Sequence, residues 1–318
     1  MSFTAEVKDD LARIGAQCPQ CERALLSALI KVCGTLHLHS SGGRSISMAT
    51  ETGVVARTVI NLSRRLYNLD TQLTFRRSVL HKTRNYLIEM PQQAGLEEAL
   101  VDLGILDERR MYVSGIVPTV VARPCCKAAY IRGVFMAAGF IADPRGDFHL
   151  EFAVSGEPFA QDLLDIIGSF SVLARLSRRR GLQVVYLKSA TSIIGLLGAI
   201  GAHREVLAIE NVRVVKSVKN ETNRRVNAEM ANSSRSSDSA GDQMYVISLA
   251  ERYLDMSSLT SALQDFCEMR KRYPTHSLRE LGQLYDPPVS KSALYHRYLR
   301  LKSLVEAARQ GQEQAPHD

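Results

Sequence analysis

Two close pairs of cysteines have the residue type and spacing of a zinc site. Cys18 and Cys21 form a Cys-x-x-Cys pair, and Cys125 and Cys126 are adjacent. A closed zinc site needs four ligands, and these four thiolates converge only if the helices that follow the two pairs meet at their N-termini. Buried free cysteine is the commoner outcome. We therefore predict no metal and no cofactor, and whether Cys18, Cys21, Cys125 and Cys126 bind a metal stays open at this point.

A second group of residues could contact a polyanion. Between Arg270 and Lys302 the chain has eight lysines and arginines against two acids, which is most of its net charge of +7. Such a basic segment is the first place to look for nucleic-acid contact. Within it, Ser277 followed by Glu280 has the pattern of a capping box, and Ser290 is expected to cap a further helix that begins at Lys291.

The helix that begins at Lys291 has two different faces. Leu294, Tyr298, Leu301 and Val305 follow helical spacing and predict a buried stripe, which leaves the lysine, serine and histidine of the first turns pointing outward. A hydrophobic back with hydrogen-bond donors at the N-terminal front is what a recognition helix needs in the major groove. The residues expected to contact DNA are Ser277, Arg279, Ser290, Lys291, Ser292, Tyr295, His296, Arg297, Arg300 and Lys302. A basic helical hairpin with solvated charges is the alternative.

The N-terminal two hundred residues contain one pattern twice. Residues 24–36 and 129–141 each read as an apolar helix of small residues that runs into a glycine and then a strand. Period-two and helical spacings extend the match to the order αββαββα in both copies. We predict an α+β domain over residues 1–215, built from repeats of about 1–110 and 111–215 around a pseudo-two-fold axis.

This duplicated order resembles the LAGLIDADG homing endonuclease fold. In that family an acid precedes the glycine of each central helix, and the two acids hold divalent metals over DNA, as two-metal nucleases require. Here Cys33 and Ala138 occupy those positions, and the earlier acid of the motif is replaced by Lys31 and Met136. We therefore expect a degenerate scaffold with no catalytic residue, which is not an enzyme.

The strand hairpins of the two repeats carry further basic side chains. A saddle-shaped basic sheet could lie on DNA, and solvated hairpin charges are the alternative of equal weight. The residues concerned are Arg76, Arg77, Lys82, Arg84, Arg178, Arg179 and Arg180.

Between the two domains lies a polar segment. Residues 216–241 are rich in serine and asparagine, cannot bury a core and predict a flexible linker. Alternatively, the asparagines cap and line a helix that docks on one domain. An all-α helix-turn-helix domain is expected over 242–318, with its motif at about 277–310.

Several motifs together resemble the WhiA family of bacterial regulators. They are the start Met1–Thr4, the segment 125–135, Tyr186–Lys188, Gly201–His203, Asn223–Arg224, Ser277–Gly282 and the residues around Ser290 and His296. The resemblance implies a degenerate LAGLIDADG domain tethered to a helix-turn-helix similar to region 4 of sigma factors. One departure is Tyr295, where the family usually has an asparagine able to pair with adenine.

The resemblance also implies a function. We expect a sequence-specific, double-stranded DNA-binding transcription regulator of cell division and chromosome segregation, linked to sporulation in actinobacterial relatives, where WhiB-like iron–sulfur regulators are partners. No apolar run is long enough for a membrane span, so a cytoplasmic, nucleoid-associated protein is expected. The rival hypotheses are a metal-dependent endonuclease and a partner- or ligand-sensing scaffold that binds DNA without sequence preference.

Overall fold

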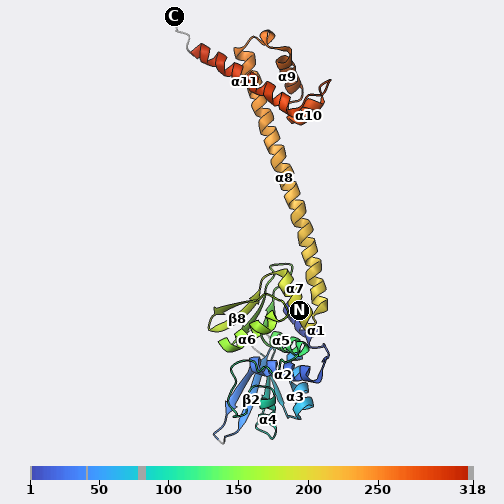
Figure 1. The fold of residues 1–318 in the computed structure, drawn as a ribbon, viewed down its shortest axis with the longest axis vertical. Coiled ribbons are helices and arrows are strands. Elements are labelled where there is room, and N and C mark those ends of the chain that lie inside the picture. The colour runs from blue at the N-terminus through green and yellow to red at the C-terminus, as the bar shows by residue number, and fades with distance from the viewer. Residues whose placement is uncertain (1, 41, 78–83, 314–318) are drawn as a thin grey trace. The chain divides into compact units, whose positions relative to one another are not determined.

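The computed structural model describes residues 2–40, 42–77 and 84–313, and the chain divides into two compact units, residues 1–216 and 217–318 (Figure 1). Each unit has its own hydrophobic core. No helix of the described residues is both long and apolar enough to cross a membrane.

The first unit contains the predicted duplication. The first repeat is α2 (Pro19–Cys33), β1 (Gly34–Leu38), β2 (Arg44–Thr50), α3 (Gly53–Tyr67), β3 (Gln72–Arg77), β4 (Arg84–Met90) and α4 (Leu96–Asp102). The second is α5 (Pro124–Ala138), β5 (Gly139–Ile141), β6 (Leu150–Val154), α6 (Glu157–Gly168), β7 (Arg175–Arg179), β8 (Leu182–Leu187) and α7 (Ala190–Ile200). Both repeats form a four-stranded antiparallel sheet with matching strand order, β1-β2-β4-β3 and β5-β6-β8-β7. The predicted α+β class and the order αββαββα are confirmed.

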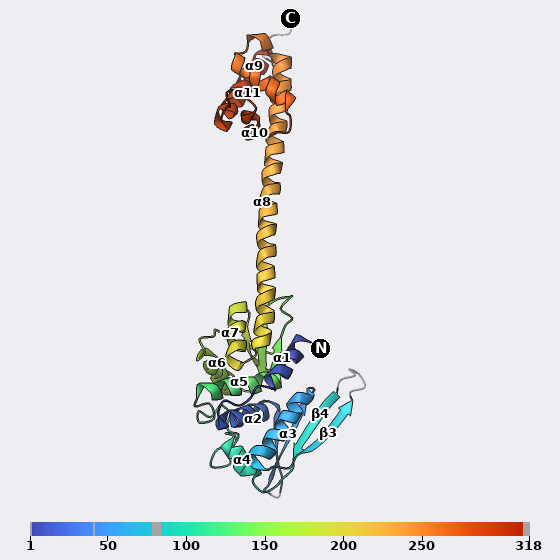
Figure 2. The ribbon, with the colours of Figure 1, turned by 90° about the vertical axis from the view of Figure 1, so that its right-hand side faces the viewer.

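The two leading helices, α2 and α5, pack against each other between the two sheets (Figures 1 and 2). Small residues bring the two backbones together at the crossing. A Cβ atom added at Gly133 of α5 would lie 2.7 Å from the Cβ of Ala28 and 2.7 Å from the carbonyl oxygen of Leu25, both in α2. Glycine is therefore the residue that permits this approach.

The chain passes from each central helix into the following strand through a glycine with the same backbone conformation. The backbone of Gly34 has φ −81° and ψ 142°, and that of Gly139 has φ −75° and ψ 141°. An added Cβ would lie 2.3 Å from the carbonyl oxygen of Ile30 in the first repeat and 2.6 Å from that of Phe135 in the second. The two glycines of the sequence pattern are thus required by one local geometry.

A short N-terminal helix, α1 (Phe3–Leu11), contacts the second repeat although it precedes the first. The hydroxyl of Thr4 donates to the carbonyl oxygen of Ile141 at 2.8 Å and accepts from its backbone N–H at 3.1 Å. β5 is an edge strand that pairs with β6 on one side only. On its open side, Thr4 satisfies the backbone N–H and carbonyl groups of Ile141, which have no neighbouring strand to bond. Val7 and Leu11 of the same helix are fully buried.

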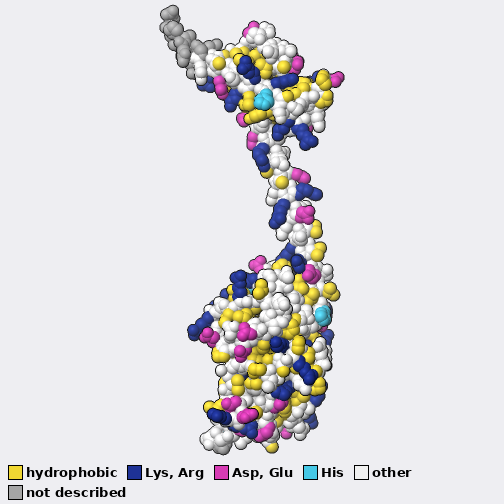
Figure 3. Space-filling view, viewed as in Figure 1, with side chains coloured by type: hydrophobic (Ala, Val, Ile, Leu, Met, Phe, Trp, Pro, Cys, Tyr) yellow, Lys and Arg dark blue, Asp and Glu magenta, His cyan; other side chains and the backbone are white. Residues whose placement is uncertain are grey.

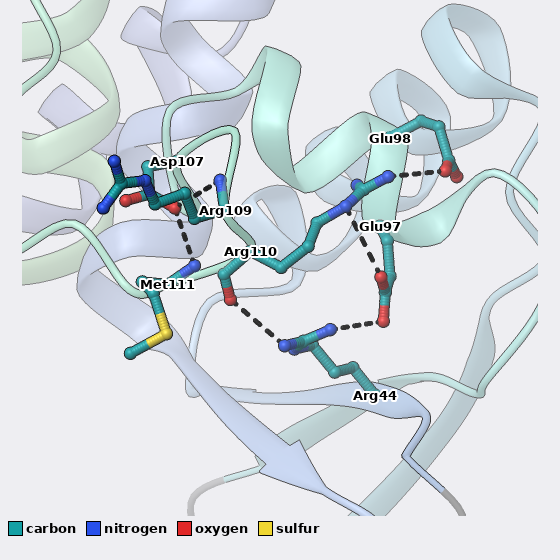
Figure 4. Close-up of polar contacts among 7 residues, drawn as sticks. All are labelled: Arg44, Glu97, Glu98, Asp107, Arg109, Arg110 and Met111. Atoms are coloured by element: carbon teal, nitrogen blue, oxygen red, sulfur yellow. Dashed lines mark hydrogen bonds and ion pairs between the residues drawn. The ribbon is translucent and has the colours of Figure 1, made fainter.

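Ion pairs tie α4 to the sheet and to the loop that follows it (Figure 4). Arg44 of β2 pairs with Glu97 at 2.5 Å and donates to the carbonyl oxygen of Arg110 at 3.1 Å. Arg110 in turn pairs with Glu98 at 2.9 Å and with Glu97 at 3.7 Å. Asp107 accepts from the backbone N–H of residues 109 and 111 and so closes the loop. These contacts fix the segment that joins the two repeats.

The second unit is helical. The C-terminal part of α8 (His203–Tyr253), together with α9 (Ser261–Arg272), α10 (Leu278–Gln283) and α11 (Lys291–Glu313), surrounds one core. Phe266, Leu281, Leu294 and Leu301 are fully buried in it. Its polar centre is Arg270, a buried guanidinium that donates to the carbonyl oxygens of Tyr273 (3.1 Å) and His276 (2.5 Å). Arg270 therefore holds the loop between α9 and α10.

The prediction of a flexible linker at 216–241 is wrong, because this segment lies within α8, a single helix of 51 residues. The chain has neither glycine nor proline between Ala202 and Ala240, so nothing interrupts helical hydrogen bonding. Residues 217–235 are all exposed; the helix itself agrees with the alternative interpretation, and its docking on one domain stays a prediction. Local pairs such as Arg225 with Glu229, at 4.0 Å, are the kind of contact that supports a helix exposed on every side.

Candidate nucleic-acid interface

Two capped helices make up the candidate DNA-binding element. The hydroxyl of Ser277 accepts from the backbone N–H of Glu280 at 3.2 Å, and the Glu280 carboxylate accepts from the N–H of Ser277 at 2.8 Å. The predicted capping box is thus confirmed. The hydroxyl of Ser290 likewise accepts from the N–H of Ala293 at 3.2 Å and caps α11. Both serine hydroxyls therefore accept N-cap hydrogen bonds, one at the start of α10 and the other at the start of α11.

A close backbone contact sets the turn between α10 and α11. The N–H of Val289 donates to the carbonyl oxygen of Gly282 at 2.9 Å, so the turn folds back onto α10. A Cβ at residue 282 would lie 2.1 Å from the carbonyl oxygen of Val289. Only glycine allows this approach, and the turn in turn positions the first residues of α11.

The outer face of α11 consists of two rows at i, i+4 spacing, which we call the front rows: Lys291, Tyr295 and Leu299 in one, and Ser292, His296 and Arg300 in the other. All six residues are exposed. Leu294, Leu301 and Val305 lie on the opposite side and are buried, and Tyr298 is half-buried. The expected division of this helix into a buried back and an outward front is therefore what the structure shows.

Arg297, another of the expected phosphate contacts, is less exposed than the front rows. The guanidinium of Arg297 lies over the ring of Tyr285, 5.5 Å from its centroid, and its Nη1 atom is buried. This side chain packs α11 against the turn that precedes it and is half-buried, so its contact with a phosphate stays a prediction. By contrast, Arg279, Arg300 and Lys302 are exposed. Lysine and arginine side chains are visible across the surface of this unit in Figure 3.

The structure adds one residue that sequence reasoning did not include. Arg235 of α8 lines a hollow of about 440 Å³ together with Arg270, Ser277, Arg279 and Lys291. The hollow lies beside the N-terminus of α11, where the helix dipole also favours an anion. Sequence reasoning left Arg235 out because residues 216–241 were expected to be a linker. The absence of glycine and proline from this segment before Gly241 was the signal that could have placed it on a helix.

The hairpin arginines of the first unit are partly placed. Arg178, Arg179 and Arg180 are exposed at the tip of the β7–β8 hairpin, where Arg180 (φ 49°) and Gly181 (φ 81°) form the turn. Lys82 lies outside the described residues, as do the side chains of Arg76, Arg77 and Arg84. The sheets are not uniformly basic, because Glu151 lies at the centre of the strands of the second sheet and pairs with His149 at 2.8 Å. Secondary DNA contact by these hairpins stays a prediction.

The positions of the nuclease acids are lined by cations. Lys31 donates to the carbonyl oxygen of Val113 and its ammonium lies 4.3 Å from the centroid of the Tyr112 ring. Burial lowers the pKa of Lys31 to about 8 and raises the pKa of the Cys33 thiol to about 11. The pKa of Lys8, which interacts with Cys33, is also lowered by burial. Neutral thiol and methyl groups with two neighbouring amines are poor ligands for a divalent metal.

At their other ends, the N-termini of α2 and α5 meet, which is the condition under which the four cysteines converge. The sulfur atoms of Cys18, Cys21, Cys125 and Cys126 all lie within 4.8 Å of one another. Burial tends to raise the pKa of Cys18, but hydrogen bonds with the other three bring it to about 6, whereas burial and the contact with Cys18 raise the pKa of Cys126 to about 12. All four cysteines are free of disulfides.

Comparison with known proteins identifies the family. Three family models match: a WhiA N-terminal LAGLIDADG-like domain at residues 19–106, a WhiA LAGLIDADG-like domain at 127–219 and a WhiA C-terminal HTH domain at 222–305. Proteins named probable cell division protein WhiA are 37% identical in Heliobacterium modesticaldum, over 98% of both chains, and 38% identical in Desulfitobacterium hafniense, over 96% of both chains.

A solved structure agrees with this assignment. The crystal structure of full-length WhiA from Thermatoga maritima covers 96% of this chain and 99% of its own, with a TM-score of 0.60 and 23% identity, and so supports the fold. The HTH match begins within α8, earlier than the expected domain start at residue 242. With its two LAGLIDADG-like repeats and its C-terminal helix-turn-helix unit, the chain belongs to the WhiA family.

Proposed function

We propose that this protein is a sequence-specific DNA-binding transcription regulator that acts in cell division and chromosome segregation. The relatives named probable cell division protein WhiA point to cell division. The observation that carries DNA reading is the pair of exposed front rows on α11, held by a buried back and a capped N-terminus. Neither repeat supplies a metal carboxylate, so the proposal includes no strand cleavage.

In this proposal different basic and polar residues contact the bases and the phosphates of DNA. Lys291, Ser292 and His296 lie in the first turns of α11, where hydrogen-bond donors of a recognition helix reach base edges. Arg300 and Lys302 are exposed further along and contact phosphates, which supply affinity without sequence information. Arg235 and Arg279 beside the helix N-terminus add a second phosphate contact. The hairpin residues 178–180 supply only sequence-independent affinity.

The variant His296→Ala tests the reading of bases. We expect specific binding to weaken by about tenfold, the loss of one base contact, with little change for random DNA. Mobility-shift titrations on a target and on a scrambled duplex, at one salt concentration, measure both. His203→Ala, an exposed histidine of the first unit, is the matched control and should change neither. Equal losses on both duplexes would refute a base-reading role.

The variant Arg300→Ala tests the phosphate contact. Its binding should weaken on target and random DNA alike, and the slope of log affinity against log salt should flatten by about one unit, since one fewer counterion is released. Titrations at several salt concentrations measure that slope. An unchanged slope would show that Arg300 does not lie on the backbone.

Supercoiled DNA incubated with the protein and magnesium or manganese should stay uncut, because Cys33 and Ala138 offer no carboxylate and Lys31 and Lys8 repel cations. An agarose gel that separates nicked from supercoiled plasmid is the measurement. Metal-dependent nicking that disappears in a Lys31→Ala variant would overturn this part of the proposal and restore the endonuclease hypothesis.

A further inference from the structure

The four clustered cysteines come from two places far apart in the chain. Cys18 is the N-cap of α2 and Cys21 lies in its first turn, whereas Cys125 and Cys126 lie in the first turn of α5. The helices pack against each other, so their N-termini bring the pairs together. Cys18 lies 3.4 Å from Cys21, 3.6 Å from Cys125 and 3.7 Å from Cys126, sulfur to sulfur.

These distances fit one tetrahedral ion. With zinc–sulfur bonds of about 2.3 Å, the sulfur atoms of a regular tetrahedron lie about 3.8 Å apart. A disulfide needs its sulfur atoms at about 2.05 Å, and iron–sulfur clusters spread their thiolates around several metal ions. The set is all sulfur, and four thiolates in a tetrahedron select zinc among the common divalent metals.

The surroundings suit a negatively charged zinc–thiolate centre. Two helix N-termini converge on the thiols, and their dipoles stabilise thiolates. Arg132, only 6% exposed, interacts electrostatically with Cys21 and donates to the carbonyl oxygens of Ile200 (3.2 Å) and Ile14 (3.4 Å). Cys21 and Cys126 are buried while Cys18 and Cys125 are partly exposed, so an ion can enter from one side.

We propose that Cys18, Cys21, Cys125 and Cys126 bind one structural zinc ion that fastens the two repeats together. Four protein ligands close the coordination sphere and leave no position for water or substrate. The α2 and α5 helices have 15 residues each, or about 22 Å of length, so the site is remote from Cys33 and Ala138 at their other ends. The zinc therefore takes no part in cleavage, and its role does not depend on DNA binding.

Metal analysis of the full-length protein, purified under reducing conditions without chelator, is the first test. We expect one zinc ion per chain by mass spectrometry. Cys126→Ser and Cys18→Ser should lose the zinc, whereas Cys33→Ser and Cys267→Ser, which replace free cysteines elsewhere, should retain it. Zinc that stays at one per chain in Cys126→Ser, or a wild-type protein that carries none even after incubation with zinc and removal of the excess, would overturn the proposal.

A second measurement stays informative if a cysteine variant does not fold. Wild-type protein whose zinc is exchanged for Co²⁺ should show the intense thiolate-to-cobalt charge-transfer band and the visible bands of a tetrahedral four-sulfur site. Weak octahedral cobalt bands would contradict the proposal. So would a disulfide among the four cysteines in protein alkylated at the moment of cell lysis. Removal of the zinc by a chelator should lower the melting temperature of residues 1–216, with no change for the helical unit.

Discussion

The variant Gly282→Ala is expected to lower the melting temperature of the helical unit by roughly 10 °C and to weaken DNA binding more than tenfold. Alanine normally stabilises a helix relative to glycine, by about 1 kcal/mol. Here the new Cβ would lie 2.1 Å from the carbonyl oxygen of Val289, so the turn must move away from α10. The turn ends at Ser290, the cap of α11, and its movement displaces the whole front of that helix.

Calorimetry and mobility-shift titration measure the two effects. Gly241→Ala is the matched control, because it also lies in a helix of residues 217–318 and its added Cβ would meet nothing within 4 Å. That change should leave DNA binding intact and raise the melting temperature slightly. Should Gly282→Ala behave like Gly241→Ala, the contact with Val289 does not constrain the turn.

The variant Gly133→Ala should destabilise the first unit by about 1–3 kcal/mol, the usual cost of overpacking. Its added methyl group would lie 2.7 Å from both the Cβ of Ala28 and the backbone of Leu25, so α2 and α5 must separate. In a unit of this size the melting temperature should fall by about 2–4 °C for each kcal/mol. DNA binding by the helical unit should be unaffected.

Gly198→Ala provides the comparison for this second variant. It lies in α7, and nothing is within 4 Å of its added Cβ. Thermal unfolding followed by circular dichroism should show Gly198→Ala at or slightly above wild type and Gly133→Ala clearly below it. Equal melting temperatures for the two variants would mean that the helix crossing tolerates separation.

The sequence predicted most of the fold because its signals were local and repeated. Alternation in the strands, helical spacing and the two glycines at 34 and 139 each report the backbone nearby, and the duplication checked every element twice. The capping box at Ser277 and the two faces of α11 were found for the same reason. The close approaches at Gly133 and Gly282 were not predicted, because they depend on backbone from another segment.

The sequence-based expectations that the structure did not bear out were drawn from the composition of residues 216–241 and from the count of basic residues. Serine and asparagine in 216–241 suggested a flexible linker, yet the segment has no glycine or proline before Gly241 and lies within one long helix with local pairs such as Arg225 with Glu229. Arg270 was counted with the basic segment, but a guanidinium on a long side chain can also be buried on carbonyl oxygens, as it is here. The convergence of the four cysteines was left open, because it depends on whether two helices meet at their N-termini, which spacing along the chain does not reveal.

The placement of α1 has a consequence for dividing the protein. Thr4 of α1 is hydrogen-bonded to a sheet-edge residue, Ile141, that lies 137 positions later in the chain. A chain that starts at Cys18 would keep both repeats intact in sequence and still leave β5 uncovered. A cut between the repeats would leave α1 on the fragment that lacks β5. The first unit is therefore interleaved, and its repeat boundary does not separate two independently packed halves.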